Sequence, residues 1–136
     1  MNVVSKKCLV VDDDEVTRMA ASEMIRSLGL EVVEAYDGRE AMEVCEREHP
    51  DVIMLDLYMP EMDGMDFLFK IRDIENKKIL QAKDKFSVKR PIIIVCSSED
   101  KSLKVGQTAH AGADDYMMKP YRIDSIREKF KDNGIF

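Results

Sequence analysis

Short apolar runs alternate with longer amphipathic segments along the whole of this chain of 136 residues. The short runs predict strands at residues 7–12, 31–35, 52–56, 91–97 and 114–118. Residues 52–55 and 92–96 are apolar throughout, which is typical of strands buried on both faces of a parallel sheet. Between the strands, apolar residues recur at helical spacing, so the pattern predicts a helix after each strand.

The helices are predicted from their apolar faces and their end signals. Gly29 is expected to end the first helix, and His49-Pro50 the second, because proline pushes the preceding residue out of helical geometry. The segment from about Asp100 to His110 has few apolar positions and contains Gly106, so it is the least regular of the predicted helices. The residues expected to face the sheet are Val16, Met19, Ala20, Met24 and Leu28 in the first helix, Ala41, Val44 and Cys45 in the second, Phe67, Leu68, Ile71 and Ile74 in the third, and Ile123, Ile126 and Phe130 in the last.

This alternation of strand and helix, repeated five times, defines the predicted fold. Connections between parallel strands are right-handed almost without exception, so the helices must cover both faces of the sheet. We therefore expect a flavodoxin-like α/β fold, (βα)5, with a doubly wound five-stranded parallel sheet. The length suits one domain over residues 1–136, and no repeat or linker divides the chain.

Composition narrows the class of protein. With 45% apolar and 35% charged residues, the chain is expected to be globular. Its longest apolar runs have four or five residues, so we expect neither membrane insertion nor a signal peptide. Cys8, Cys45 and Cys96 each lie in an apolar stretch without CxxC spacing, which predicts buried reduced thiols in a cytoplasmic protein rather than a metal site.

The net charge of −6 is unevenly distributed along the chain. Residues 1–69 carry a net charge of −11, residues 70–90 carry +5, and residues 91–136 are balanced. An acidic chain binds nucleic acid poorly, so we expect no direct contact with nucleic acid.

Polar residues follow four of the predicted strands at their carboxyl ends, where open parallel α/β sheets carry their chemistry. In chain order they are Asp12 and Asp13, Asp56, Ser97 and Ser98, and Lys119-Pro120. Carboxylates brought together repel one another unless a cation joins them, and Mg²⁺ suits such oxygen ligands. With Lys119 and a hydroxyl nearby, the set can hold a transferred phosphoryl group, for which Asp56 is the nucleophile. Taken singly, each residue has an ordinary explanation, because aspartates cap helices, serines lie in turns and lysines lie on surfaces.

In this order, the motifs resemble those of response-regulator receiver domains, and the resemblance covers nearly the whole chain. The matching segments are Leu9-Val10-Val11-Asp12-Asp13, Asp56-Leu57-Tyr58-Met59-Pro60-Glu61-Met62-Asp63-Gly64, Ser97 after the apolar run, and Gly112-Ala113-Asp114-Asp115-Tyr116-Met117-Met118-Lys119-Pro120.

The resemblance implies a role for each matching residue. Asp56 is the phosphoacceptor, and Lys119 is the cation that pairs with the phosphoryl group. Ser97 takes the position of the switch hydroxyl, where receivers often have threonine, and Tyr116 that of the switch aromatic residue. The implied Mg²⁺ ligands are Asp12, Asp13, Asp56 and the backbone carbonyl of Tyr58.

The sequence departs from the family pattern between the third helix and the fourth strand. Residues 71–90 form a stretch roughly ten residues longer than the family usually needs, whereas connections are typically short. This basic extension, at about residues 72–90, contains Lys77, Lys78, Lys83, Lys85, Lys89 and Arg90. It is either a solvated continuation of the helix or a docking surface for an acidic partner.

The main alternative is a Mg²⁺-dependent phosphatase of the haloacid dehalogenase type. There Asp12 is the nucleophile, Asp14 the general acid, and Asp114-Asp115 the late acidic pair. The lysine of that family precedes the late acidic pair, whereas Lys119 follows it, and this interpretation leaves Asp56 unexplained. A receiver-like module without phosphate chemistry is not favoured, because every reactive residue is present, and a flavin site needs a phosphate loop that the first strand lacks.

The sequence therefore predicts a phosphorylation-dependent signalling switch rather than an enzyme that turns over a metabolite. A sensor histidine kinase or a histidine phosphotransfer protein donates the phosphoryl group to Asp56 with Mg²⁺, and the domain contributes to its own phosphorylation and dephosphorylation. The signal is expected to pass through Ser97 and Tyr116 to the face formed by the last two helices and the last strand. No DNA-binding or catalytic segment follows the last helix, so we expect output through a downstream protein, unless the chain is part of a longer one.

Overall fold

Five parallel strands form one sheet, in the order β2-β1-β3-β4-β5. The structure is a computed structural model that describes residues 5–57, 64–84, 88–97, 109 and 111–136. The strands are β1 (Lys7–Val11), β2 (Glu31–Ala35), β3 (Val52–Asp56), β4 (Ile92–Ser97) and β5 (Asp115–Met118). All five predicted strands are therefore present.

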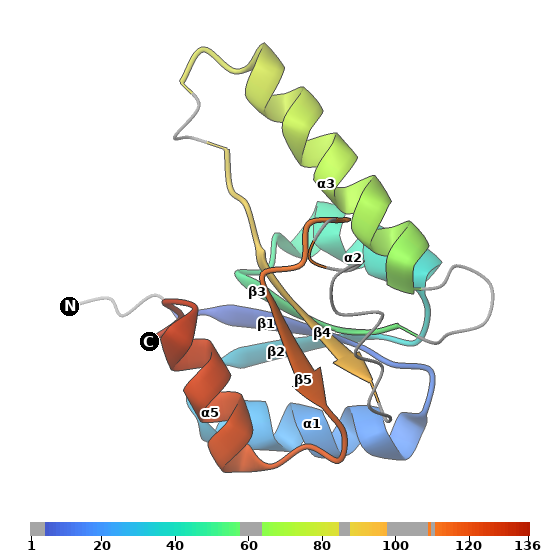
Figure 1. Cartoon of the computed structure of the whole chain (residues 1–136), viewed down its shortest axis with the longest axis vertical. Coiled ribbons are helices and arrows are strands. Elements are labelled where there is room, and N and C mark those ends of the chain that lie inside the picture. The colour runs from blue at the N-terminus through green and yellow to red at the C-terminus, as the bar shows by residue number, and fades with distance from the viewer. Residues whose placement is uncertain (1–4, 58–63, 85–87, 98–108, 110) are drawn as a thin grey trace.

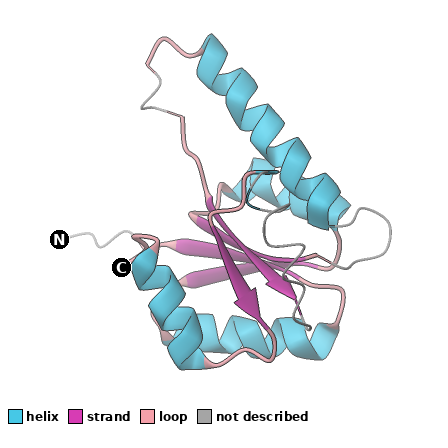
Figure 2. Ribbon diagram, in the orientation of Figure 1, coloured by secondary structure: helices cyan, strands magenta, loops and turns pink. Residues whose placement is uncertain are grey.

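Helices cover both faces of the sheet, as the alternating pattern predicts. They are α1 (Glu15–Ser27), α2 (Gly38–Glu48), α3 (Gly64–Gln81) and α5 (Ile123–Asp132). Helices α2 and α3 lie on one face, and α1 and α5 lie on the other (Figures 1 and 2). The predicted helix at Asp100–His110 lies, apart from Ala109, outside the described residues. Among the described helices, none is long and apolar enough to cross a membrane.

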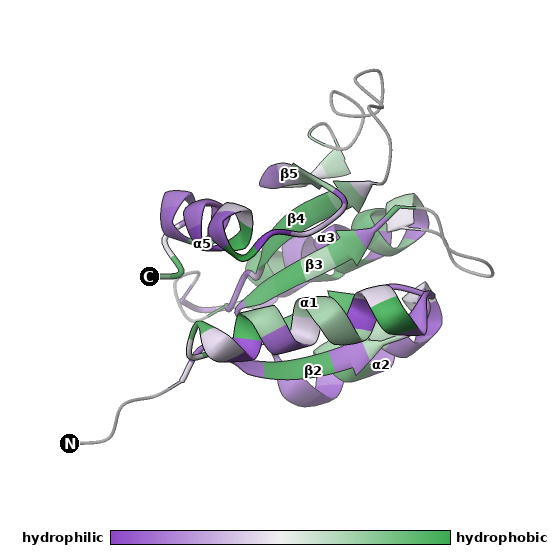
Figure 3. Cartoon of the chain, turned by 90° about the horizontal axis from the view of Figure 1, so that it is seen from below, coloured by the Kyte–Doolittle hydropathy of each residue, from purple (hydrophilic) through white to green (hydrophobic). Residues whose placement is uncertain are grey.

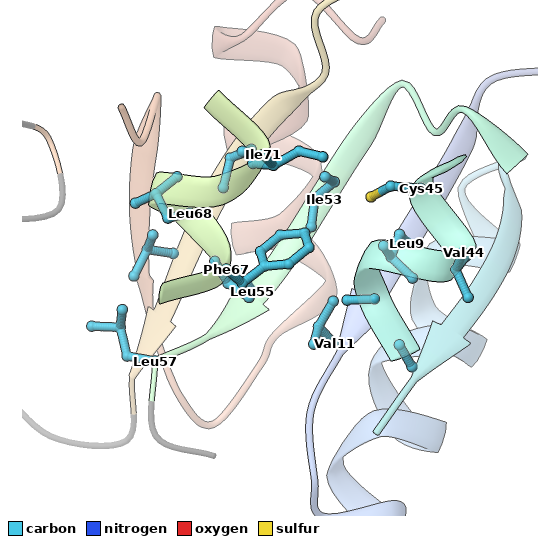
Figure 4. Close-up of a cluster of buried hydrophobic side chains, with 14 of the residues drawn as sticks. Leu9, Val11, Val44, Cys45, Ile53, Leu55, Leu57, Phe67, Leu68 and Ile71 are labelled. Atoms are coloured by element: carbon cyan, nitrogen blue, oxygen red, sulfur yellow. The ribbon is translucent and has the colours of Figure 1, made fainter. Parts of the chain in front are cut away.

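The core consists of two apolar clusters, one on each face of the sheet. Every residue of β3 is buried, as its uniform apolar pattern predicts. Figure 4 shows the cluster beneath α2 and α3, in which Phe67 lies beside β3. The second cluster joins the sheet to Ala21 and Ile25 of α1 and to Phe130 of α5. Figure 3 shows the resulting contrast between the apolar strands β3 and β4 and the largely polar helices α2 and α5.

The three cysteines are buried and unpaired, as predicted. Burial raises the pKa of the thiols of Cys45 and Cys96 to about 12, and it raises that of Cys8 as well. Thiols with such pKa values carry little thiolate at neutral pH, so these cysteines act as small core residues.

The predicted inner face of α1 is wrong in the first turns of the helix, whereas Met24 and Leu28 are partly buried and pack against the core as predicted. The buried residues of this helix are Ala21, Ser22 and Ile25, whereas Val16 and Met19 are 76% and 51% exposed. Ala20 is exposed as well. Ser22 can be buried because its hydroxyl donates a hydrogen bond of 2.8 Å to the carbonyl of Arg18. The hydrophobic pattern therefore assigned Ser22 to the surface although it is buried, and assigned Val16 and Met19 to the core although they face outward.

Two further apolar positions differ from prediction. Ile74 of α3 and Ile123 at the start of α5 are each 36% exposed. The buried positions on this part of α3 are Arg72 and Glu75, which a hydrophobic pattern does not select. The predicted ends of the first two helices are confirmed. Gly29 adopts a φ of 97° just after α1, and α2 ends before His49 and Pro50.

Arg72 anchors α3 to the beginnings of β4 and β5. Its guanidinium donates hydrogen bonds to both oxygens of Glu75 (3.1 and 2.9 Å), to Asp114 (2.7 Å), and to the carbonyls of Pro91 and Gly112 (2.9 Å each). Arg72 and Glu75 are only 6% and 5% exposed. Gly112 has a φ of 114°, and a Cβ there would lie 2.7 Å from the Arg72 side chain, so glycine is required.

The basic extension continues α3 beyond the sheet. An 18-residue helix is about 27 Å long, and its last buried residue is Glu75. From there α3 projects past the amino ends of the strands (Figure 1). The chain returns where the N–H of Ile92 binds the carbonyl of Asp51. The first part of the extension is thus a continuation of the helix.

We predict that Arg72→Met destabilises the fold by about 3–5 kcal/mol, because the buried carboxylate of Glu75 loses its two hydrogen bonds and keeps only the guanidinium of Arg90 at 3.9 Å. Lys77→Met is the matched control, since Lys77 forms an exposed ion pair with Asp73 on the same helix. It should change the free energy of unfolding by less than about 1 kcal/mol. Urea unfolding followed by circular dichroism measures both, and equal effects would contradict the assigned role of Arg72.

Candidate functional site

The residues expected to act together do meet at the carboxyl edge of the sheet. Asp12 directly follows β1, Asp56 ends β3, and Ser97 ends β4. The N–H of Lys119 donates a hydrogen bond of 2.7 Å to the carbonyl of Ser97, which holds the end of β5 beside that of β4. The N–H of Leu57 binds the carbonyl of Cys96 in the same way. Parallel register therefore assembles this site from distant parts of the chain.

Three aspartates form an acidic cluster at this edge. Asp12, Asp13 and Asp56 each place a carboxylate oxygen within 4.8 Å of the others. Asp12 is 1% exposed and Asp56 is 5% exposed, whereas Asp13 is exposed to solvent. An all-oxygen set that is open on one side fits a hard divalent cation such as Mg²⁺, which keeps several water ligands. Tyr58, whose carbonyl is the fourth expected ligand, lies outside the described residues.

Lys119 brings a positive charge into the cluster. Its ammonium lies 2.7 Å from Asp12 Oδ2 and 3.5 Å from Asp56 Oδ2. Burial alone would lower the pKa of Lys119, but the hydrogen bond to Asp12 and the charges of Asp56 and Asp12 raise it above its ordinary value. Lys119 is therefore held as a cation, bonded to Asp12 and close to the predicted phosphoacceptor.

Asp14 belongs to the helix and not to the cluster. It is the N-cap of α1, where its carboxylate accepts hydrogen bonds from the N–H (2.9 Å) and the hydroxyl of Thr17. The hydroxyl and then the N–H of Thr17 lower the pKa of Asp14. A carboxyl group held ionised in this way is poorly suited to act as the general acid of the phosphatase alternative.

The late acidic pair of that alternative also lies elsewhere. Asp114 accepts hydrogen bonds from Arg72 (2.7 Å) and from the N–H of Ile93 (2.8 Å), at the opposite edge of the sheet from Asp56. Asp115 pairs with Lys129 of α5. Neither joins the acidic cluster among the described residues. This geometry does not support the phosphatase interpretation.

Gly64 allows α3 to start against the end of β3. Its N–H donates a hydrogen bond of 3.0 Å to the carbonyl of Leu57. A Cβ at this position would meet the carbonyl oxygen of Asp56 and lie 2.7 Å from Leu57 Cα, so a side chain would push the backbone of Asp56 and Leu57 out of place. Gly64 is therefore required by the close approach of α3 to the end of β3.

The two expected switch residues lie on neighbouring strands. Ser97 is fully buried at the end of β4. Tyr116 on β5 is half-buried and packs against the apolar cluster beneath α2 and α3, with Val95 of β4 as its register partner. Ser98 lies outside the described residues.

Two features of the site were not found in the sequence. Arg18 of α1 donates a hydrogen bond of 2.8 Å to the carbonyl of Asp12, and no local pattern signals this contact. A groove of about 420 Å³ beside Lys119 is lined by residues of α1 and of the segment after β5, including Val16, Ala20 and Tyr121. The exposure of Val16 is visible only once the orientation of α1 is known.

A doubly wound sheet with three aspartates and a lysine at its carboxyl edge defines a class of α/β domains with an acidic cation site. A family model described as the response regulator receiver domain matches residues 8–131. The chain belongs to this family of two-component signalling domains, whose members typically use Mg²⁺ at an acidic pocket.

Individual relatives agree with this assignment. The chemotaxis protein CheY of Thermotoga maritima is 35% identical over 92% of this chain and 94% of its own length. The structure of chemotaxis protein CheY4 of Vibrio cholerae has a TM-score of 0.80 at 26% identity, and covers 95% of this chain and 98% of that one. The receiver domain of a response regulator of Saccharomyces cerevisiae, solved with its histidine phosphotransfer signalling protein, shares the fold at 21% identity, with a TM-score of 0.83 over 94% of this chain and 88% of that one. The chain spans about half the length of several other relatives.

We predict that Asp13→Asn weakens Mg²⁺ binding by about tenfold or more, whereas Asp14→Asn changes it little. Asp13→Asn removes a charged oxygen ligand from the cation site. Asp14→Asn keeps a side-chain oxygen that can cap α1 and changes no ligand. Isothermal titration with Mg²⁺ measures both variants, which differ from the wild type by the same single charge. Equal losses of affinity would contradict the assigned ligands.

Proposed function

We propose that residues 1–136 form a single receiver domain, including the basic extension, and that the domain is switched by phosphorylation of Asp56. The supporting observation is the setting of this carboxylate. Its side chain is 7% exposed, with Lys119 at 3.5 Å and the oxygens of Asp12 and Asp13 close by. Buried like charges disfavour one another, so a divalent cation and a phosphoryl group both find complementary groups here.

In the proposed reaction, a carboxylate oxygen of Asp56 attacks the phosphorus of a phosphohistidine. An O–P bond forms to give an acyl phosphate, the P–N bond breaks, and the leaving imidazole nitrogen keeps the electron pair and takes up a proton. Lys119 would leave Asp12 and pair with the phosphoryl oxygens, which its distance of 3.5 Å from Asp56 Oδ2 supports. Asp12, Asp13, Asp56 and the Tyr58 carbonyl would hold Mg²⁺, which when bound supplies charge that stabilises the transferring group.

We predict that acetyl phosphate with Mg²⁺ labels Asp56 and no other residue. Reductive trapping of the acyl phosphate followed by mass spectrometry identifies the modified position. Asp56→Asn should abolish labelling because an amide oxygen is a poor nucleophile, and the circular dichroism spectrum should stay that of the wild type. Label on Asp12 would instead support the phosphatase mechanism.

The proposed donor is a sensor histidine kinase or a histidine phosphotransfer protein that docks beside Lys119. The groove there and the outward side of α1 expose Val16 and Met19, which are 76% and 51% exposed. Exposed apolar residues grouped next to a reactive site are typical of a protein interface. The yeast receiver shows that this fold accommodates a histidine phosphotransfer protein. A transfer assay across a panel of histidine kinases would identify the donor.

We propose that the signal leaves the site through Ser97 and Tyr116. A phosphoryl group on Asp56 presents oxygens that the Ser97 hydroxyl can bind by moving inward, which changes the space beside β5. Tyr116, packed at the edge of its cluster, can follow by changing rotamer. The altered face would comprise β5, α5 and the helix expected at about Asp100–His110, which apart from Ala109 lies outside the described residues, and a downstream protein would bind there.

This path predicts a response to the phosphoryl mimic beryllofluoride that depends on Ser97. In NMR spectra of the wild type, the amide shifts of residues 98–122 should change when the mimic binds. Ser97→Ala should still bind the mimic, as seen from the shift of Asp56, with a much smaller change in residues 98–122. An equally large change in this variant would disprove the link.

A further inference from the structure

Arg18 connects helix α1, strand β2 and the turn that carries the acidic pair. Its Nη1 donates a hydrogen bond of 2.8 Å to the carbonyl of Asp12, and its Nε donates one of 3.0 Å to Glu34 Oε1. The side chain is 16% exposed. Its backbone is fixed as well, because its N–H binds the carbonyl of Asp14 and its own carbonyl accepts the hydroxyl of Ser22.

Every polar group of Asp12 has a partner in this arrangement. Its N–H donates to the carbonyl of Ala35 (3.1 Å), Oδ1 accepts from the N–H of Asp14 (2.9 Å), and Oδ2 accepts from Lys119 (2.7 Å). The carbonyl of Asp12 is the group that Arg18 holds. These bonds fix both the backbone and the rotamer of Asp12, and Arg18 supplies the one that comes from a side chain of α1.

The position of Arg18 is electrostatically unfavourable for a cation site. A guanidinium bonded to the backbone of Asp12 lies close to the place where a divalent cation would bind, and like charges repel. Glu34 offsets part of this charge. If Arg18 acted on the site through its charge alone, its removal would tighten the binding of a divalent cation.

We propose that Arg18 is a positioning residue for the cation site, and that it holds the Asp12–Asp14 turn so that the carboxylates of Asp12 and Asp13 point to a common centre. This inference rests on the proposed function of the acidic cluster. The planar guanidinium can reach Glu34 and the Asp12 carbonyl at once, because its donors form a rigid fork. Groups behind the ligands of a metal commonly change its affinity by ten- to a hundredfold, roughly, when they are removed.

The experiment measures the affinity for Mn²⁺, a spectroscopic substitute for Mg²⁺, from the electron paramagnetic resonance signal of the unbound ion. Arg18→Met keeps the aliphatic part of the side chain and removes its donors. Arg26→Met is the matched control, because Arg26 lies on the same helix and approaches the same Glu34 at 3.9 Å. Arg26 makes no hydrogen bond to Asp12 among the described residues.

We expect Arg18→Met to weaken Mn²⁺ binding about tenfold, although it removes a repelling charge, and Arg26→Met to leave it within about twofold. Arg18→Lys keeps the charge but cannot span both acceptors, so it should weaken binding by about threefold or more. This variant also decides the matter if Arg18→Met does not fold. Unchanged or tighter binding in Arg18→Met, or unchanged binding in Arg18→Lys, would overturn the proposal.

The same titrations separate this inference from the proposed function. If the wild type binds Mn²⁺ and Asp13→Asn binds it about tenfold or more weakly, the cation site stands whatever Arg18 does. If the wild type fails to bind Mn²⁺, or Asp13→Asn binds it equally well, the cation site itself is wrong. Thermal melts of the variants without metal report any purely structural contribution of Arg18, which would lower the melting temperature without changing Mn²⁺ affinity.

Discussion

The burial of Asp12 and Asp56 next to each other is the constraint on which the rest of this structure depends. Two carboxylates at 1% and 5% exposure lose most of their hydration and repel one another. Lys119 compensates for part of this cost, at 2.7 and 3.5 Å from the two groups. One ammonium cannot neutralise three carboxylates, so the edge of the sheet keeps an excess of negative charge in a geometry that fits a further cation.

Precise placement of these charges depends on backbone geometry more than on side-chain packing. The carboxyl ends of β1, β3 and β4 are held by bonds between neighbouring strands, and the segment after β5 is tied to Ser97. Gly64 lets the first turn of α3 lie against the carbonyl of Asp56, where any side chain would collide. The geometry of the site therefore depends on the pairing of the strands and on glycine at position 64.

The buried charged groups at the two ends of the strands differ in how far they are paired within the protein. At the carboxyl end the charges are unbalanced and open to a ligand. At the amino end Arg72 meets Glu75 and Asp114 and two carbonyls, so its donors are satisfied within the protein. A buried network whose donors are satisfied within the protein fixes how the elements pack. It also fixes the part of α3 from which the helix projects beyond the sheet.

The sequence by itself determined the strands, the sheet and the residues of the acidic site. Apolar runs such as Val52 to Leu55 are local, and any residue that follows such a run must come to the carboxyl edge of a parallel sheet, as Asp12 and Asp56 do. The orientation of α1, the partners of Arg18 and the network of Arg72 were decided by the tertiary structure. The side-chain and carbonyl partners of Arg72 lie up to 42 residues away, and Lys119 lies 107 residues from Asp12. Patterns of hydrophobicity report whether a position suits burial, but a buried serine or arginine is stable only with partners that folding alone brings within hydrogen-bond distance.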